Sequence, residues 1–209
     1  MTTIVIDESL LKRFPEIYLS TREIEVEVRA SRNLAEELEK LRERMPYRLE
    51  TLKDEPVARA FRDFYWRIGI DPTKQRPAGE ALARRILSGS GIPAINNLVD
   101  AGNLASAETL IPIGIYDLDK ISGTLTLRFA HEGEEFMDIR GKRSKLSSNE
   151  IVLVDGLGVV HIFPHRDSYR TKITSSTKRA LIVGCGVKGV PKNLVEEACD
   201  KVIQYLGVL

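Results

Sequence analysis

Apolar residues recur along the chain with two different periods, and the change from one to the other predicts its secondary structure. Where they return every three or four residues, the pattern is that of an amphipathic helix. It predicts helices over residues 8–14, 32–45, 56–68, 78–88, 95–110 and 192–206. Where they alternate or form short runs, the pattern is that of a strand. It predicts strands over residues 2–6, 17–21, 23–28, 113–116, 124–130, 151–155, 159–163 and 180–183.

Single residues mark where these elements start, stop or break. Ser31 stands where an N-cap would begin the helix over 32–45, and Pro46 ends that helix. Gly102 falls inside the helix over 95–110 and predicts an interruption there. The Asp-Gly-Leu-Gly sequence at 155–158 predicts a hairpin turn between two strands.

This order of elements predicts an α+β fold, in which a mixed or antiparallel sheet is packed with helices. Residues 74–77 form an expected linker, extended because Arg76 precedes a proline. We therefore expect two parts: an N-terminal α/β extension over residues 1–75, and a core over residues 76–209 on which the extension packs.

Composition adds bounds on function. With 31 basic and 30 acidic residues among 209, the chain has a formal net charge of +1, so RNA binding would need a local basic patch. Cys185 and Cys199 lack metal-ligand spacing and are expected to be reduced. No nucleotide or metal motif occurs, so we expect neither a cofactor nor a metal. Without a signal peptide or a long apolar run, a cytoplasmic protein with no membrane contact is expected.

The first candidate site is a line of polar residues on the helix over 95–110. Asn96, Asp100 and Asn103 are spaced i, i+4 and i+7, so a helix places them on one face. Such a line is either a buried polar network or the wall of a site. On the strand that follows, Asp117 and Asp119 are predicted to share a face, where they could do acid–base work, or one could cap the next turn.

The second candidate site is the segment after the strand over 159–163, which mixes imidazole, guanidinium and hydroxyl groups. Its members are His165, Arg166, Ser168, Arg170, Thr171 and Lys172. The segment is either a loop that holds a phosphate, a carboxylate or another polar ligand, or a solvated turn in which Asp167 pairs with an arginine. Lys178 and Arg179 keep the region basic, which makes it the predicted patch for RNA backbone contact.

Two further residues receive structural interpretations. His161 alternates with Val160 and Ile162, which predicts a place on the outer face of its strand. Cys185 has only Lys188 nearby to activate it, so we interpret it as a small buried apolar residue rather than a nucleophile.

Several short segments, in this order, resemble one known family. They are Arg76-Pro77 before Glu80, Asn96-Asn97 before Asp100 and Asn103, Pro112-Ile113-Gly114 before Tyr116-Asp117, Thr126-Leu127-Arg128, and Gly133-Glu134-Glu135-Phe136. Together they resemble the editing, tRNA-binding module (B3/4) of the phenylalanyl-tRNA synthetase beta subunit, over roughly residues 76–183. The resemblance implies that module's fold and a link to hydrolysis of mischarged tyrosine on tRNA. It also implies that residues 1–75 correspond to the extra segment of free-standing relatives.

The residues that edit tyrosine in that family are not retained. Its histidine corresponds to Gly114 in this chain, and its glutamate falls near Val183. Its glycine-rich loop is replaced by the charged residues 164–170. Because neither glycine nor valine can orient an ester or recognise a hydroxyl, the scaffold carries over and the tyrosine-editing site does not.

Three hypotheses follow. In the first, the chain hydrolyses an aminoacyl-tRNA ester in trans: Asp117 and the Asn96 face orient the aminoacyl group, and His165 moves the proton. Further substrate contacts would come from Gly114, Arg166, Ser168 and Thr171.

In the second hypothesis, the chain is a non-catalytic module for the aminoacylated 3′ end of tRNA or for a small amino-acid-like ligand. Its phosphate contacts come from Arg170, Lys172, Lys178 and Arg179. In the third, it is a metabolic enzyme that shares only the fold. No oligomeric state is predicted.

Overall fold

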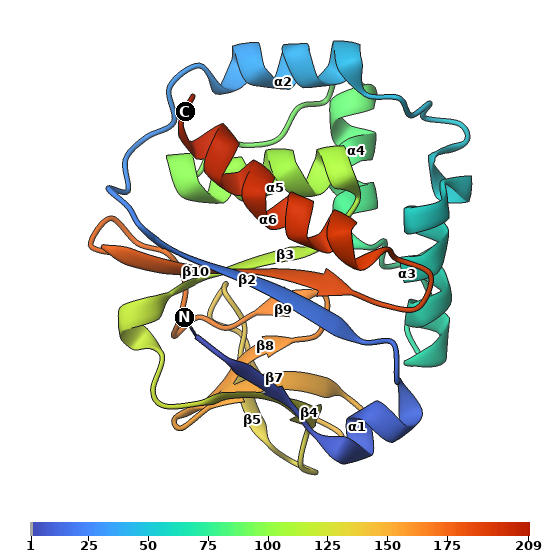
Figure 1. The fold of residues 1–209 in the computed structure, drawn as a ribbon, viewed down its shortest axis with the longest axis vertical. Helices are drawn as coiled ribbons and strands as arrows, with labels where there is room; N and C mark the ends of the chain where they lie inside the picture. The colour runs from blue at the N-terminus through green and yellow to red at the C-terminus, as the bar shows by residue number, and fades with distance from the viewer. Residues whose placement is uncertain (1) are drawn as a thin grey trace.

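The computed structural model describes residues 2–209, and its elements are stacked in three layers (Figure 1). Helices form one outer layer, a three-stranded sheet lies in the middle, and a five-stranded sheet forms the other side. The predicted α+β fold, with a mixed sheet packed with helices, is confirmed.

The middle sheet is antiparallel and has the order β2-β10-β3. Its strands are β2 (Tyr18–Glu25), β10 (Arg179–Gly186) and β3 (Ile113–Asp117). The outer sheet has the order β1-β4-β7-β8-β9 and is mixed, because β1 runs parallel to β4 while the other pairs are antiparallel. Its strands are β1 (Ile4–Ile6), β4 (Leu125–Phe129), β7 (Ile151–Asp155), β8 (Gly158–Ile162) and β9 (Arg166–Asp167).

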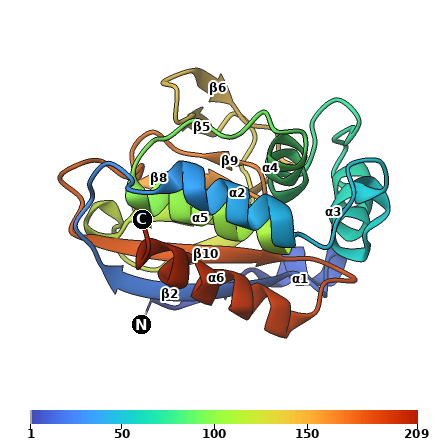
Figure 2. The same ribbon diagram turned by 90° about the horizontal axis from the view of Figure 1, so that it is seen from above.

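A separate hairpin of β5 (Glu135–Met137) and β6 (Arg143–Lys145) covers part of the outer sheet. Its Phe136 packs with Val152 and Val159 in a small apolar cluster on that face. Seen from above, the hairpin projects on the side opposite β2 and α6 (Figure 2).

The helical layer is built on the middle sheet by α5 (Asn97–Thr109) and α6 (Lys192–Leu206), with α4 (Ala78–Leu87) and α2 (Leu34–Arg44) further out. The helix α3 (Pro56–Arg67) runs down one flank from this layer toward the outer sheet (Figure 1). The remaining short elements are α1 (Glu8–Arg13), η1 (Leu52–Asp54) and η2 (Leu118–Lys120).

The strand β10 divides the two main cores because its side chains alternate between the faces of the middle sheet. Leu181 and Val183 point into the core between the two sheets. Ala180 and Ile182 point into the core beneath the helices. A residue on β10 or its neighbours therefore faces either the inter-sheet space or the helices, and this sets which side chains can meet.

Three local predictions are corrected. The helix α5 is not interrupted at Gly102, where a Cβ would stand 2.5 Å from Ile115 Cδ1, so the glycine permits close helix–sheet packing. Asn33, not Ser31, precedes α2, because the Ser31 hydroxyl instead bonds Asp100 of α5. The strands predicted over 17–21 and 23–28 form one strand, β2, held along its whole length by β10.

The first 75 residues contribute a strand to each of the two larger sheets. The strand β1 pairs with β4, and β2 pairs with β10. Within residues 2–209, none of the helices combines the length and apolar character needed to cross a bilayer.

Candidate functional site

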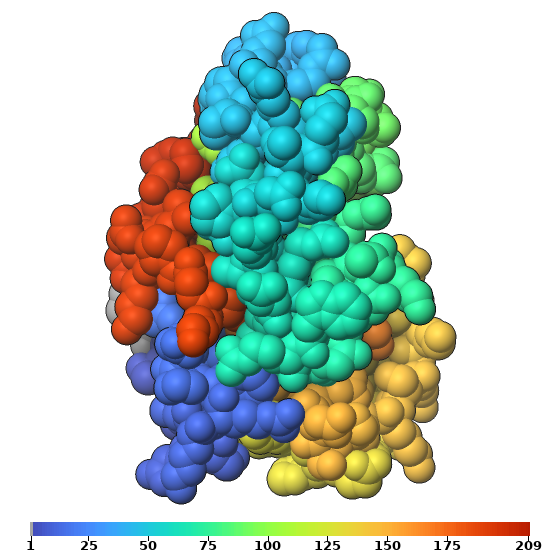
Figure 3. All heavy atoms as spheres, turned by 90° about the vertical axis from the view of Figure 1, so that its right-hand side faces the viewer, coloured from blue at the N-terminus to red at the C-terminus, as the bar shows by residue number. Residues whose placement is uncertain are grey.

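A pocket of about 300 Å³ contains two residues that the sequence marked, His165 and Arg166. Its walls come from segments far apart in the chain: the end of α3 and the residues after it, the turn before β7, and the turn from β8 to β9. On this face, the segment around residue 70 lies against the segment around residues 145–165 (Figure 3). A volume near 300 Å³ is at the small end for ligand pockets and matches a group of amino-acid size.

The lining combines an apolar side with a few polar groups. Ile68, Ile70 and Phe163 provide apolar surface. Arg166 and Glu150 contribute opposite charges, and within residues 2–209 the Arg166 guanidinium has no ion-pair partner. An unpaired guanidinium in a concave site is suited to a phosphate or carboxylate.

The tight turn between β8 and β9 positions His165. Its backbone N–H donates to Ile162 O at 2.8 Å, and its ring lies edge-on to Tyr65, with 6.1 Å between ring centroids. Burial, and then charge repulsion from His161 and Arg166, lower the pKa of His165 to about 3. The imidazole is therefore neutral at physiological pH and a weak base. Its Nδ1 is buried without a hydrogen-bond partner.

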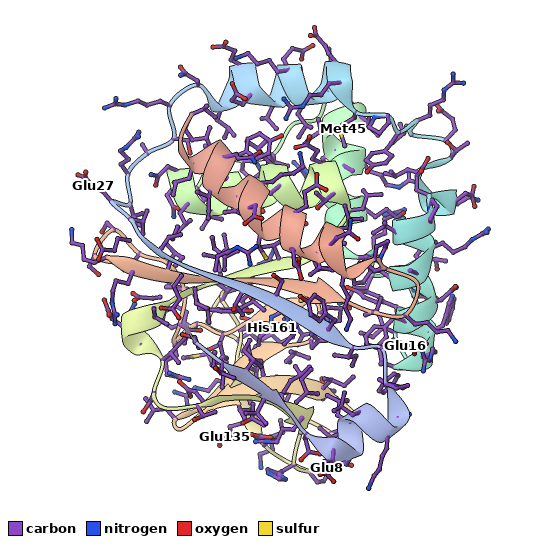
Figure 4. The ribbon with its side chains drawn as sticks, in the orientation of Figure 1. Glu8, Glu16, Glu27, Met45, Glu135 and His161 are labelled. Atoms are coloured by element: carbon purple, nitrogen blue, oxygen red, sulfur yellow. The ribbon has the colours of Figure 1, made fainter. Side chains whose placement is uncertain are left out.

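A second imidazole lies behind this pocket, at His161. The prediction that His161 faces outward is wrong: it is 6% exposed and lies between the two large sheets (Figure 4). Its ring contacts Tyr116 of β3 on one side and Phe163, a pocket wall, on the other. The strand is covered on both faces, so alternation along it did not reveal an exposed side.

His161 is held by a carboxylate across the β8–β9 pair. The two residues are direct partners in the strand register, and His161 Nδ1 lies 2.9 Å from Asp167 Oδ1. A carboxylate at Nδ1 favours the tautomer with its proton there, which leaves Nε2 as an acceptor. His161 Nε2 is buried and has no partner among the described residues.

Tyr116 closes the space that Gly114 leaves open. A Cβ at Gly114 would stand 2.0 Å from the Tyr116 phenol oxygen, so no larger residue fits there without displacing Tyr116. Burial, and then the charge of Asp167, raise the pKa of Tyr116 well above its ordinary value. A buried, protonated phenol therefore fills the space beside Gly114.

Four buried side-chain polar atoms in residues 2–209 have no hydrogen-bond partner: Tyr65 Oη, His161 Nε2, His165 Nδ1 and Thr171 Oγ1. Tyr65 and His165 are in ring contact, and His161 is close enough to affect the pKa of His165. Thr171 lies beside β3, where its carbonyl accepts from the Asp117 N–H at 2.8 Å. Buried polar atoms are nearly always paired, so the unpaired atoms of Tyr65, His161 and His165 mark a place suited to a polar ligand or water.

Asp117, predicted to be catalytic, is engaged in local bonds at the end of β3. Its Oδ2 accepts from Thr177 at 2.8 Å and lies 3.3 Å from the Lys120 ammonium, and its Oδ1 accepts from the Asp119 N–H at 3.2 Å. The strand ends at Asp117 and η2 begins, so Asp119 does not share its face and instead pairs with Arg179 at 2.7 Å. The expected pair of carboxylates is therefore separated, and Asp117 caps the turn.

The polar line on α5 lies elsewhere and has a structural use. Asn96 caps the helix by accepting from the Val99 N–H at 2.9 Å. Asp100 is fully buried, accepts from the Ile95 N–H at 3.0 Å, and has a pKa raised by burial. Asn103 is half-buried further along the helix. None of the three lines the pocket of His165.

The predicted basic patch is divided. Lys178 and Arg179 lie beside Glu25, Glu27 and Asp119, so their surroundings are acidic. On another surface, Arg170 pairs with Asp155 at 2.6 Å, and Lys172 Nζ lies 3.6 Å from the centre of the Tyr169 ring. Ser168 is buried and uncharged, and its Oγ accepts from the Arg170 N–H at 3.1 Å.

Sequence reasoning missed the His161–Asp167 pair, together with Tyr65 and Tyr116. The available signal was the turn at Phe163-Pro164-His165, which folds the chain back and brings residues six apart into register. Recognising β9, a strand of two residues, would have paired His161 with Asp167.

Comparison with known proteins connects this geometry to a family. The profile of the B3/4 domain matches residues 60–207. The chain belongs to the B3/4 domain family. Among curated relatives, the phenylalanine–tRNA ligase beta subunit of Bartonella quintana is 36% identical over 96 residues, or 46% of this chain. That of Neisseria meningitidis serogroup B is 41% identical over 76 residues, or 36% of this chain.

This B3/4 domain corresponds to a small part of those relatives. The matched stretches cover 12% and 10% of the two beta subunits. Among solved structures, an N-terminal fragment of the phenylalanyl-tRNA synthetase beta subunit from Pyrococcus horikoshii matches 99% of this chain and 48% of its own, with a TM-score of 0.52 and 17% identity. That likeness shows a shared fold, including the first 59 residues that the family profile does not match.

Proposed function

We propose that this B3/4 domain recognises the aminoacyl group on the 3′ end of a tRNA, in the pocket of His165 and Arg166. One observation supports this most: the Arg166 guanidinium, which has no ion-pair partner among the described residues, and the neutral His165 imidazole line the same pocket of about 300 Å³. The relatives are named as subunits of a tRNA ligase, so tRNA is the natural partner to test.

The chemistry of the pocket fits the parts of an aminoacyl-tRNA end. Arg166 would bind the terminal phosphate, and Glu150 would attract the aminoacyl ammonium. Ile70 and Phe163 would cover an apolar side chain. His165, which is neutral, would hydrogen-bond the ligand rather than accept its proton.

Hydrolysis of the ester is a second candidate, favoured by the His161–Asp167 pair. His161 Nε2 would take a proton from water, and the resulting hydroxide would attack the ester carbonyl carbon. The bond to the ribose oxygen would break, and the proton would pass from the imidazole to that oxygen. Because Phe163 stands between His161 and the pocket, the ester reaches Nε2 only if this wall moves.

One set of RNAs tests both functions. Binding is measured by fluorescence anisotropy with uncharged tRNA and with tRNA that carries an amide-linked, non-hydrolysable aminoacyl group, across a panel of amino acids. We expect at least one aminoacyl group to tighten binding by about tenfold or more, and Arg166→Ala to remove that gain. Arg48→Ala, an exposed arginine outside the pocket, is the matched control. Equal affinity for charged and uncharged tRNA across the panel would refute recognition.

The ester-linked forms of the same tRNAs then decide between recognition and hydrolysis. Release of the amino acid above the rate in buffer, lost in Asp167→Asn while binding persists, establishes hydrolysis. Binding without release excludes it and leaves recognition as the function.

A further inference from the structure

The β5–β6 hairpin carries a concentration of positive charge in a chain that is nearly neutral overall. Arg140, Lys142, Arg143 and Lys145 follow one another within six residues, and all four are exposed. Asp138 Oδ1 accepts from the backbone N–H groups of Arg140 and Lys142, each at 3.0 Å, so this carboxylate is used to hold the turn. Among the residues that the structure describes, none of the four cations forms an ion pair.

Beneath the hairpin lies a pocket of about 620 Å³. Phe136, Met137 and Leu157 give it apolar surface, Arg143 and Lys145 give it positive charge, and Glu135 adds one carboxylate. Arg170 also lines it, but its guanidinium is paired with Asp155. Leu157 is 68% exposed at the rim. A pocket of this volume can hold a nucleobase, and the cations that line it can contact the attached phosphates.

An exposed aromatic ring extends this surface. The Tyr169 N–H donates to Met137 O at 2.9 Å, which fixes Tyr169 against the hairpin. Its ring is exposed on the surface, with the Lys172 ammonium 3.6 Å from the ring centre. Aromatic rings beside cations, on a basic surface, are the usual platform for the bases and phosphates of a single strand.

We propose that this surface, made by the β5–β6 hairpin, the pocket beneath it, Tyr169 and Lys172, binds single-stranded RNA. Bases occupy the pocket and stack on Tyr169, while the hairpin cations contact phosphates. Because the outer sheet lies between this pocket and His161, the RNA surface is separate from the inter-sheet site. It does not require the aminoacyl-binding pocket to function.

The test uses the full chain and a labelled, uncharged, single-stranded RNA of about 12 nucleotides, at several salt concentrations starting near 50 mM. We expect measurable binding that weakens with salt. Arg143→Ala with Lys145→Ala should weaken it about tenfold or more and reduce the slope of log affinity against log salt by about 1.4, since each phosphate contact on a single strand contributes about 0.7. Tyr169→Ala should weaken it at least about fivefold with little change in the slope.

Lys74→Ala with Arg48→Ala removes the same charge from exposed positions elsewhere and is the matched control. Single-stranded DNA and duplex RNA of the same sequence form the comparison arms. No binding near 50 mM salt, equal weakening by the control, or equal affinity for the duplex overturns the proposal. Tighter binding of DNA than of RNA would overturn the choice of RNA. Arg166→Ala should bind this RNA normally, so failure here and failure of aminoacyl recognition are distinguishable.

Discussion

His165 couples the candidate pocket to the stability of the fold. In the unfolded chain its imidazole takes up a proton near pH 6.5, whereas burial in the folded protein lowers the pKa to about 3. Between these values the unfolded state binds a proton that the folded state does not. Protonation therefore favours unfolding, and the stability that is present above pH 6.5 is lost as the pH falls toward 3.

We expect this residue to lower the free energy of unfolding by about 1–2 kcal/mol between pH 7 and pH 5. His165→Gln keeps a polar side chain without titrating, so its stability should fall by that much less over the same interval. Urea unfolding of both proteins at the two pH values measures the difference. Identical pH dependence in the two would show that His165 is accessible to protons in the folded state.

At the scale of elements, the long amphipathic helices and buried strands were predictable, because their periodicity comes from packing on one or two cores. The strands β5, β6 and β9 were not, because each has two or three residues and lacks a measurable period. The same limit explains why only part of the candidate site was predictable. His165 and Arg166 could be found from their chemistry alone, whereas the His161–Asp167 pair depends on the register between β8 and β9.

The helices α3 and α4 are joined by a buried ion pair. Arg62 Nη1 lies 2.9 Å from both carboxylate oxygens of Glu80, which is fully buried, and Arg84 Nε adds a contact at 3.3 Å. Glu80 is also part of the stretch that carries the family resemblance. A carboxylate in this position is tolerated only while its cationic partners remain.

Arg62→Ala should therefore destabilise the protein by about 3 kcal/mol, since it leaves a buried carboxylate with Arg84 alone. Arg59→Ala is the control on the same helix: its side chain is 65% exposed and lies 3.7 Å from Asp54, so we expect a change below about 0.5 kcal/mol. Urea unfolding followed by circular dichroism compares the two. Similar losses in both variants would mean that the Glu80 carboxylate is not dependent on Arg62.

On the scale of the whole molecule, the two ends of the chain are interleaved in the sheets. The N-terminal strand β2 pairs with β10 along eight residues, from Glu25 opposite Arg179 to Tyr18 opposite Gly186. The helix α6 packs against both of these strands. The N-terminal residues therefore complete the middle sheet, although the family profile begins only at residue 60.

This arrangement predicts the behaviour of a fragment that contains only residues 76–209. Without β2 and α3, β10 becomes an edge strand with unpaired backbone groups, and the inter-sheet core around Leu181 and Val183 loses its cover from Phe61 and Phe64. We expect the fragment to show no cooperative urea transition by circular dichroism and to aggregate, whereas the full chain unfolds in a single transition. A cooperative transition near the midpoint of the full chain would instead establish residues 76–209 as a domain that folds by itself, with residues 1–75 as an extension packed on it.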